Sequence, residues 1–600
     1  MKLKTFFLFS ALMLTGLITA QETYMLTGQV VAAKDNTTLP GASITILGTK
    51  NTVIADNEGE FSIEVKENSS LQISFIGMTT RVVLVNGQKD ITISLEDESK
   101  SLDEVVVVGY GTQKKSSITG SVSKLENTNL DENTVSRVDK ALQGRIAGLQ
   151  IQNITSEVGE APQIRIRGMG SISASSDPLV VVDGFPVQNG LEFINPSTIE
   201  SIEVLKDASS TAIYGSRGAN GVIIVTTKSG SESKTLYEFK SFFGVKSVYD
   251  KIDMYDTYSY TDMLRNERQL HENYLAGIEN RVPSTIAYTA REKGMRQVAN
   301  NSNGGTDWQD EGTRNFATIK NYQLNVSGGG KTANYYVSGQ YIEDEGLMKD
   351  NFLKRINFQS RVRTKLSDKL SLDFNLRPSY SKRRRSTISY SDLTRSLGFM
   401  PVRHNDYTSA LTGYPVGDYA QGRHFNNVNF DYIDENGQPQ NFTTSLWGTN
   451  NNSPISRMEN ETRFIHDYRM LANFALEYKI TKRLTFKTSG GVNTEYSNYE
   501  RFRNSLADQT GQAIGEDDST LKTDILTENT LNYKWKGDNH SVDALGGMTY
   551  QKTNIKGTGI YGTQFPSDYI ETLNGANIID ANETFTRKEQ IGLLSFLARV

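Results

Sequence analysis

The chain has no cysteine among its 600 residues. It therefore has no disulfide framework, no thiolate metal site, no catalytic thiol and no lipid-bearing cysteine. Proline is scarce, with 12 residues, or about 2% against an average near 5%. Charge of one sign is also lacking: 64 Lys+Arg face 69 Asp+Glu, a net charge of −5. Bulk positive charge therefore does not drive this chain onto nucleic acid.

Tyrosine, phenylalanine and glycine are plentiful, with 28, 25 and 50 residues, while hydrophobic residues make up only 37% of the chain. A polar chain that is rich in aromatic residues and poor in proline suits long strands with alternating faces. We therefore predict a mainly β protein.

The first twenty residues predict a secretory signal peptide, residues 1–20. Lys2 and Lys4 precede a mostly apolar run over residues 6–18, and Ala20 offers a small residue before the cleavage point. Ile18 departs from the preferred small residue, which leaves the cleavage site open by a few positions. The alternative is an anchor helix, but thirteen residues are too few to cross about 30 Å of hydrocarbon. No later stretch approaches 18 consecutive apolar residues.

Residues 23–96 contain short alternating segments separated by turn residues. The segments are 29–31, 43–46, 61–65, 71–75 and 91–95. About seven short strands in this length predict a small antiparallel β-sandwich. Asp56, Glu58 and Gly59 indicate a tight turn, since the twelve-residue calcium-loop pattern is absent.

Residues 102–111 form a short segment of very high β-propensity, with four valines flanked by acidic residues and glycines. Its members are Asp103, Glu104, Val105, Val106, Val107, Val108 and Gly109. One interpretation is a last strand of the sandwich or an internal strand of the next domain. The other is a strand that pairs with a sheet edge of another protein, because such pairing depends on backbone hydrogen bonds.

Residues 113–230 predict a compact α+β domain. Arg165 and Arg167 alternate with isoleucines before Gly168, and a buried strand over 179–182 ends at Asp183 and Gly184. A short helix is predicted from an Asp207 N-cap to Gly215. A buried strand over 222–226 closes the domain.

From about residue 235 the sequence repeats a two-residue period in pairs of segments. Apolar residues occupy one face of 356–366, 370–376, 470–478, 484–492, 531–535 and 542–550, and polar residues the other. Strands of about ten residues with short turns on one side and long polar loops on the other are typical of an outer-membrane barrel. The predicted long loops are 382–464 and 496–524. A secreted β-sandwich or solenoid is the alternative, but it would not readily explain hairpins this long.

The sequence contains no convincing catalytic or metal-binding motif. We therefore expect a protein that is not an enzyme and that binds no metal or cofactor. The five histidines are scattered without a zinc-binding pair. Residues 557–562 match G-x-G-x-x-G but no helix follows, so they do not indicate a dinucleotide site. The basic run 382–385 indicates a solvated loop or contact with anionic lipid headgroups rather than nucleic acid.

Several long motifs occur in one order, and together they resemble the SusC/RagA-type TonB-linked outer-membrane transporters of Bacteroidota. The motifs are residues 102–111, 164–168, 178–184, 202–208, 213–222 and 306–310. Segments 27–30, 39–42 and 56–61 resemble the carboxypeptidase-regulatory-like sandwich, an accessory module.

The resemblance implies the accessory sandwich (23–96), a TonB box (102–111), a plug domain (113–230) and a barrel of about 22 strands from residue 235. Residues 235–600 hold about half of such a barrel, and the chain stops inside an alternating run. We therefore expect the N-terminal portion of a longer transporter; a naturally short protein is the alternative. The implied partners are TonB with its ExbB–ExbD energising complex, a SusD-like lipoprotein lid and outer-membrane lipid.

The implied function is TonB-dependent import of an oligosaccharide or oligopeptide, with the plug rearranged through residues 103–109. A siderophore receptor and a non-transporting adhesin or signalling receptor are the alternatives. Within the plug, Arg165 and Arg167 are expected to meet the polar inner wall of the barrel, and the glycines of 213–222 to allow close turns. The plug motif comprises Arg165, Arg167, Gly168, Asp183, Gly184, Tyr214, Gly215, Arg217, Gly218, Asn220 and Gly221.

Overall fold

The computed structural model describes most of the chain, which divides into two compact units. The described residues are 23–33, 35–49, 51–96, 105–108, 111–114, 122–126, 137–155, 157–168, 170, 175–187, 190–447, 452–537 and 540–600. The predicted signal peptide lies outside them. The first unit covers residues 1–106 and 112–119, and the second covers 107–111 and 120–600.

The first unit contains a seven-stranded sandwich. Its strands are β1 (Thr23–Ala32), β2 (Ser43–Ile46), β3 (Thr52–Ile54), β4 (Glu60–Lys66), β5 (Ser70–Ser74), β6 (Arg81–Leu84) and β7 (Asp90–Leu95). One sheet has the order β4-β1-β7 and the other β3-β2-β5-β6. The prediction of a purely antiparallel sandwich is wrong at one pair, because β7 lies parallel to β1. The last strand returns to the free edge of the first strand in the same direction.

The segment 56–60 forms the predicted tight turn. The Asp56 carboxylate accepts hydrogen bonds from the backbone N–H of Glu58 at 3.1 Å and of Glu60 at 2.8 Å. Gly59 has a φ of +74°, a conformation that a side chain would disfavour. Asp56 is therefore occupied with the backbone of its own turn.

The plug region of the second unit is built on a mixed five-stranded sheet of order β10-β15-β16-β13-β14. Its strands are β10 (Val122–Glu126), β13 (Leu179–Val182), β14 (Phe185–Val187), β15 (Ile199–Leu205) and β16 (Val222–Thr227). A hairpin of β11 (Leu149–Gln152) and β12 (Gln163–Ile166) accompanies it, with helices α2 (Val138–Leu142), η3 (Pro196–Thr198), α3 (Ala208–Thr211) and η4 (Ala212–Gly218). Buried Val, Ile and Leu side chains from both groups form one core.

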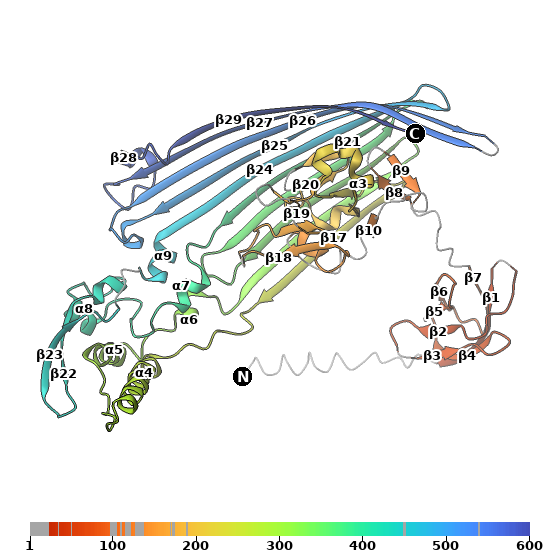
Figure 1. Cartoon of the computed structure of the whole chain (residues 1–600). Helices are drawn as coiled ribbons and strands as arrows, with labels where there is room; N and C mark the ends of the chain where they lie inside the picture. The colour runs from red at the N-terminus through yellow and green to blue at the C-terminus, as the bar shows by residue number, and fades with distance from the viewer. Residues whose placement is uncertain are drawn as a thin grey trace, which may run out of the picture. The chain divides into compact units, whose positions relative to one another are not determined.

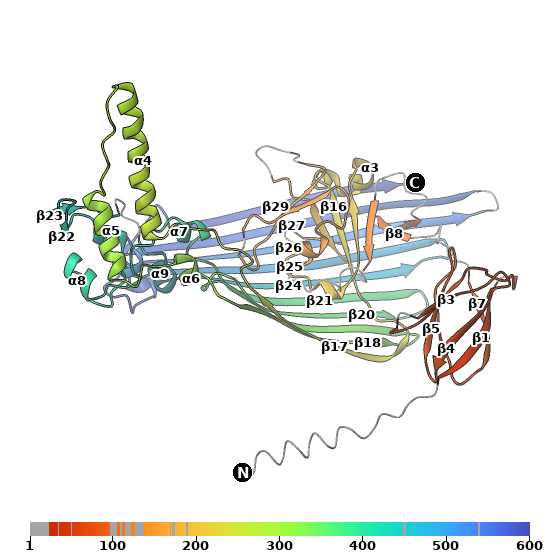
Figure 2. The same ribbon diagram turned by 90° about the horizontal axis from the view of Figure 1, so that it is seen from below.

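The rest of the unit is dominated by one long antiparallel sheet, which we call the wall (Figure 1). Its strands are β17 (Ser233–Lys246), β18 (Ala317–Gly329), β19 (Ala333–Glu345), β20 (Phe352–Lys365), β21 (Leu370–Arg384), β24 (Glu461–Lys479), β25 (Leu484–Arg503), β26 (Ile514–Lys536), β27 (Ser541–Thr563), β28 (Ile578–Ile579) and β29 (Phe585–Arg599). Consecutive wall strands are neighbours from β17 to β27, and β27 pairs with both β28 and β29. Figure 2 shows the plug on one face of the wall.

The wall carries its apolar side chains on the face away from the plug. On β20, Ile356 is 53% exposed and Phe358 41%, whereas Gln359 and Arg361 are buried. A protein that folds in water buries the opposite set. Apolar residues outward and polar residues inward are the arrangement of a membrane-spanning barrel strand.

The prediction of a long loop over residues 496–524 is wrong. The connection between β21 and β24 is long, but residues 496–524 lie almost wholly in strands, with only residues 504–513 between β25 and β26. The wall strands reach up to 23 residues rather than about ten. Beyond the apolar band both faces of a strand are polar, so the alternation that marks a strand is lost there.

Two connections build a helical body at one end of the wall, which we call the cap: residues 247–316 and 385–460. It contains α4 (Thr257–Ile278), α5 (Ala290–Asn300), α6 (Trp308–Gly312), α7 (Tyr390–Thr394), α8 (Asp406–Thr412), η5 (Gly422–Phe425), β22 (Val428–Ile433), β23 (Pro439–Thr444) and α9 (Pro454–Asn460). Short turns η6 (Ser505–Ala507) and η7 (Leu573–Gly575) occur in later connections. Buried aromatic and aliphatic side chains give the cap its own core. None of the described helices combines the length and apolarity needed to span a membrane.

Candidate functional site

The plug contacts the polar face of the wall, and this contact is the candidate functional site. Leu471 of β24 and Leu526 of β26 belong to the same core as the plug side chain Phe185. A Cβ placed on Gly491 would lie 2.8 Å from the Phe185 ring. The missing side chain at this position lets the plug come close to the wall.

Asp183 is the centre of a buried polar cluster between plug and wall. It follows β13 and has a φ of +46°, so the turn with Gly184 points its carboxylate toward the wall. Thr227 of β16 donates to it from its backbone N–H at 3.0 Å and from its hydroxyl at 2.8 Å.

The wall supplies three more donors to the same carboxylate. Arg361 of β20 donates at 3.2 Å, Asn375 of β21 at 3.1 Å, and Arg377 of β21 also donates. The side chains of Asp183, Arg361 and Arg377 are each at most 7% exposed. If one partner of this buried cluster were lost, the other charge would stay buried without compensation, which is strongly destabilising.

Glu192 is the second plug carboxylate held by the wall. Its side chain lies 3.5 Å from Arg137 of the plug and 3.4 Å from Arg469 of β24. Arg355 of β20 donates to the Glu192 backbone oxygen at 2.6 Å. Burial alone would raise the pKa of Glu192, but the Arg469 and Arg137 charges outweigh it and lower the pKa to about 2.

The basic run 382–385 also contacts the plug. Arg383 reaches Glu160 at 3.2 Å, and Arg385 reaches Glu157 at 3.1 Å. The expectation of a solvated loop or lipid contact is therefore wrong for these two arginines. The sequence showed the charges but not the plug carboxylates that meet them.

The predicted contact of Arg165 and Arg167 with the polar inner wall is not among the side-chain hydrogen bonds and ion pairs of the described residues. Within the described part of the chain, no carboxylate pairs with either guanidinium, and Arg165 Nε is buried without a hydrogen-bond partner. Arg167 is exposed, with a φ of +58°, and leads to Gly168 at +104°. Strand β12 pairs with β11, and the Ile166 side chain packs into the plug core.

The segment 207–222 forms a tight turn region of the plug. Asp207 caps α3 by accepting from the backbone N–H of Ser210 at 3.0 Å. The helical path then breaks at Gly215, whose φ of +59° and ψ of −145° are open to glycine. A Cβ on Gly218 would lie 2.8 Å from the Thr211 carbonyl oxygen.

The other residues of the plug motif contact the plug core, the wall or a neighbouring plug segment. Tyr214 packs against a small plug core, and burial raises its pKa. Arg217 donates to Gln551 of wall strand β27. Asn220 donates to the Ser175 backbone oxygen at 3.0 Å, and a Cβ on Gly221 would lie 2.7 Å from the Ile166 side chain.

Val105–Val108 is strand β8, and it forms a two-stranded sheet with β9 (Gly111–Lys114). Asp103, Glu104 and Gly109 of the predicted TonB box lie outside the described residues. A two-stranded sheet gives each strand one neighbour, so β8 has a second edge with no partner in the described part of the chain.

Sequence reasoning missed the residues that bind Asp183 and Glu192. Arg355 and Arg361 lie on the polar face of β20, and this alternation was the available signal. Arg137 gave no signal, because it precedes a short helix without any pattern around it. Across the described residues no cluster of three His, Asp or Glu side chains suits a metal ion.

The chain matches known protein families and relatives. The TonB-dependent Receptor Plug Domain family matches residues 114–222, and the CarboxypepD_reg-like domain family matches residues 26–107. TonB-dependent receptor P3 of Formosa agariphila is 33% identical over 575 residues, which are 94% of this chain and 52% of that protein. TonB-dependent receptor SusC of Bacteroides thetaiotaomicron is 31% identical over 469 residues, 74% of this chain and 44% of that protein. The chain belongs to the SusC/RagA type of TonB-dependent receptors.

Solved structures agree on the fold of this receptor chain. The RagAB peptide importer in the 'open-open' state has a TM-score of 0.63 at 23% identity, covering 82% of this chain and 54% of that one. The receptor chain thus spans about half the length of the curated relatives it matches. The mainly β fold with sandwich, plug and partial wall is confirmed, while the domain boundaries stay predictions.

Proposed function

We propose that this receptor chain is part of an outer-membrane transporter that imports a large ligand, an oligosaccharide or an oligopeptide, with energy delivered by TonB. The observation that carries the proposal is a plug packed on the polar face of a wall whose other face is apolar and exposed. In a closed barrel a plug in this place blocks the lumen. Import then requires the plug to rearrange.

The contacts between plug and wall suit a plug that stays in place until mechanical energy moves it. Asp183 and Glu192 each join plug and wall through buried arginines. A plug that moves has to separate these charges, and any charge left buried without its partner is strongly unfavourable. The outer membrane has no ATP and no ion gradient, so this work has to arrive mechanically.

Residues 102–111 are the proposed TonB box. The second edge of β8 accepts a strand of TonB by β-augmentation, and the ExbB–ExbD complex energises TonB from the inner membrane. A SusD-like lipoprotein is proposed as the lid, and 22 strands as the closed barrel. RagAB is named as a peptide importer, which favours peptide, and oligosaccharide stays the second candidate.

The experiment compares uptake and binding in cells that carry the intact receptor. Deleting residues 103–109 is expected to abolish uptake of the transported ligand and to leave ligand binding unchanged. Val106→Pro removes a backbone donor and should do the same, whereas Val106→Thr keeps the donor and serves as the matched control. Fluorescent oligopeptides and oligosaccharides are offered in parallel. Unchanged uptake in the deletion would refute energisation through this segment.

A further inference from the structure

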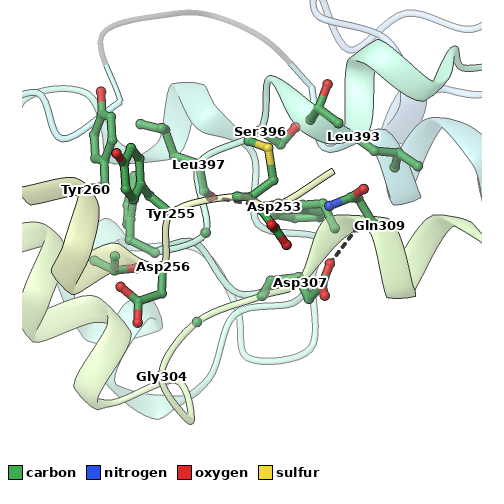
Figure 3. A pocket seen from close by; sticks show the side chains of 18 of the residues that line it. Asp253, Tyr255, Asp256, Tyr260, Gly304, Asp307, Gln309, Leu393, Ser396 and Leu397 are labelled. Atoms are coloured by element: carbon green, nitrogen blue, oxygen red, sulfur yellow. Dashed lines mark hydrogen bonds between the residues drawn. The ribbon is translucent and has the colours of Figure 1, made fainter. Parts of the chain in front are cut away.

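The cap contains a pocket that plays no part in holding the plug. It lies where segments 251–257, 303–309 and 393–399 meet, together with Tyr260, Met263 and Met295, and its volume is 730 Å³. This size is within the range of small-molecule sites. Figure 3 shows its labelled side chains arranged around one space.

Glycines and a tryptophan shape this pocket. Gly305 has a φ of +106°, and a Cβ there would overlap the Gly398 carbonyl oxygen. Thr306 donates its backbone N–H to the same oxygen at 2.7 Å. The buried Trp308 donates its indole N–H to the Leu397 oxygen at 3.0 Å. These bonds fix the pocket floor between segments that are far apart in the sequence.

The pocket lining carries a net negative charge. Asp253, Asp256 and Asp307 line it, and its one lysine, Lys251, is paired with Asp310. Asp256 and Asp307 cap helices α4 and α6 through backbone N–H groups at 2.7 and 2.9 Å. Asp253 is exposed and has no hydrogen bond or ion pair within the described residues.

Beside the carboxylates, the pocket offers apolar and aromatic surface. Tyr255 is 62% exposed and Met254 49%, with Tyr260 and Leu397 completing the lining. Aromatic faces attract cations and also pack against apolar stems. A neutral or anionic ligand would leave the carboxylates uncompensated.

A buried hydroxyl is also without a partner here. Thr257 lines the pocket and is 3% exposed, yet its Oγ1 has no hydrogen-bond partner in the described structure. It faces the floor, because a Cβ on Gly305 would lie 3.4 Å from it. A buried hydroxyl is normally hydrogen-bonded, so this one is an unused acceptor in the lining of the pocket.

We propose that the cap pocket binds an ammonium or guanidinium group carried on an apolar or sugar-ring stem. Asp253, Asp256 and Asp307 supply the countercharge, Thr257 accepts an N–H, and Tyr255 packs on the stem. Two sources carry this chemistry: a basic side chain or amino terminus of a peptide, and an amino sugar. The proposal concerns binding alone and holds whether or not the receptor imports its ligand.

The test titrates the detergent-solubilised intact receptor by calorimetry with two pairs of probes. The first pair is Ala-Lys-Ala, blocked at both ends, and its Nε-acetylated form; the second is the trimer of glucosamine and that of N-acetylglucosamine. Binding of either cationic probe, tenfold or more tighter than its acetylated partner and weakened by salt, supports the proposal and identifies the source. Equal binding of both members, or no binding by either cationic probe, overturns it.

Variants locate the binding. Asp253→Asn, Asp256→Asn and Asp307→Asn remove charge but keep cap acceptors, since asparagine caps helices as well as aspartate. Each should weaken binding about two- to fivefold, whereas Glu267→Gln on the exposed side of α4 should not. Thr257→Val should weaken binding without lowering the melting temperature. Wild-type affinity in the triple Asp→Asn variant would place the ligand elsewhere and refute the site.

Discussion

Replacing Asp183 by asparagine tests whether the buried cluster anchors the plug. Five donors from Thr227, Arg361, Asn375 and Arg377 converge on its two oxygens. Asparagine keeps the shape and tolerates the positive φ, but it offers one oxygen and turns an NH₂ group toward donors. The substitution therefore isolates the charge.

The size of the destabilisation depends on which carboxylates Arg361 and Arg377 still contact after the substitution. Arg361 keeps a second carboxylate, Asp373, at 2.8 Å. Arg377 has no other carboxylate within the described residues, so its charge is left buried and unpaired. Removing one partner of such a pair costs about 3–5 kcal/mol, which corresponds to a factor of roughly 10² to 4 × 10³ in local opening.

Hydrogen exchange read by mass spectrometry measures this opening in the solubilised receptor. Peptides covering residues 179–187 and 222–227 should exchange faster in the Asp183→Asn variant by that factor, with wall strands unchanged. Glu160→Gln, which loses a half-exposed pair with Arg383, is the matched control and should change exchange severalfold at most. Wild-type exchange in Asp183→Asn would show that the cluster does not anchor the plug.

Three further predictions concern the turns and the titrating groups. Gly221→Ala should destabilise the plug more than Gly184→Ala in thermal unfolding, by at least about 1 kcal/mol: both have a positive φ, but only the first meets neighbouring atoms; equal losses would contradict this. The pKa of Glu192 is lowered to about 2, so its stabilisation is present above the ordinary pKa and is lost as pH falls toward 2. Glu192→Gln should flatten the pH dependence of the free energy of plug opening between pH 5 and 2, measured by exchange corrected for the intrinsic rate, and an unchanged slope would count against it. Burial lowers the pKa of His404 to about 4 and of His424 to about 3, and their rings share a hydrogen bond of 2.9 Å. Cap stability should therefore decline as pH falls below about 6.5, and protection factors of residues 404–425 that do not change with pH would exclude this.

The wall could be predicted from sequence where one face of a strand meets lipid. In 356–366 the alternation of apolar and polar residues gave both the strand β20 and its outward face. In 496–524 both faces are polar, so the same reasoning predicted a loop where β25 and β26 continue. Helix α4 was missed because it buries few residues, Thr257, Thr261 and Ala276, and so shows only a weak apolar stripe.

The sequence indicates which types of residue join the plug to the wall, but not which residues pair with each other. Asp183 and Gly184 stood out as a strand end, and arginines stood out on polar faces. Which carboxylate meets which arginine depends on how two domains fit together, so Arg165 and Arg167 were assigned a contact that Arg361 and Arg377 make. Glu192 and Arg137 are single charges in irregular segments, where no period marks them.

The strand order of the plug sheet sets the sequence in which a pull from the N-terminal side would take it apart. Strand β10 is the first plug strand along the chain, and it lies at the sheet edge, held by five residue pairs to β15. Strand β16 lies in the middle and continues through residues 228–232 into β17, a tether of at most about 17 Å when fully extended. If TonB pulls on residues 102–111 as proposed, we expect the edge strand β10 to separate first and the central strand β16 to stay joined to wall strand β17.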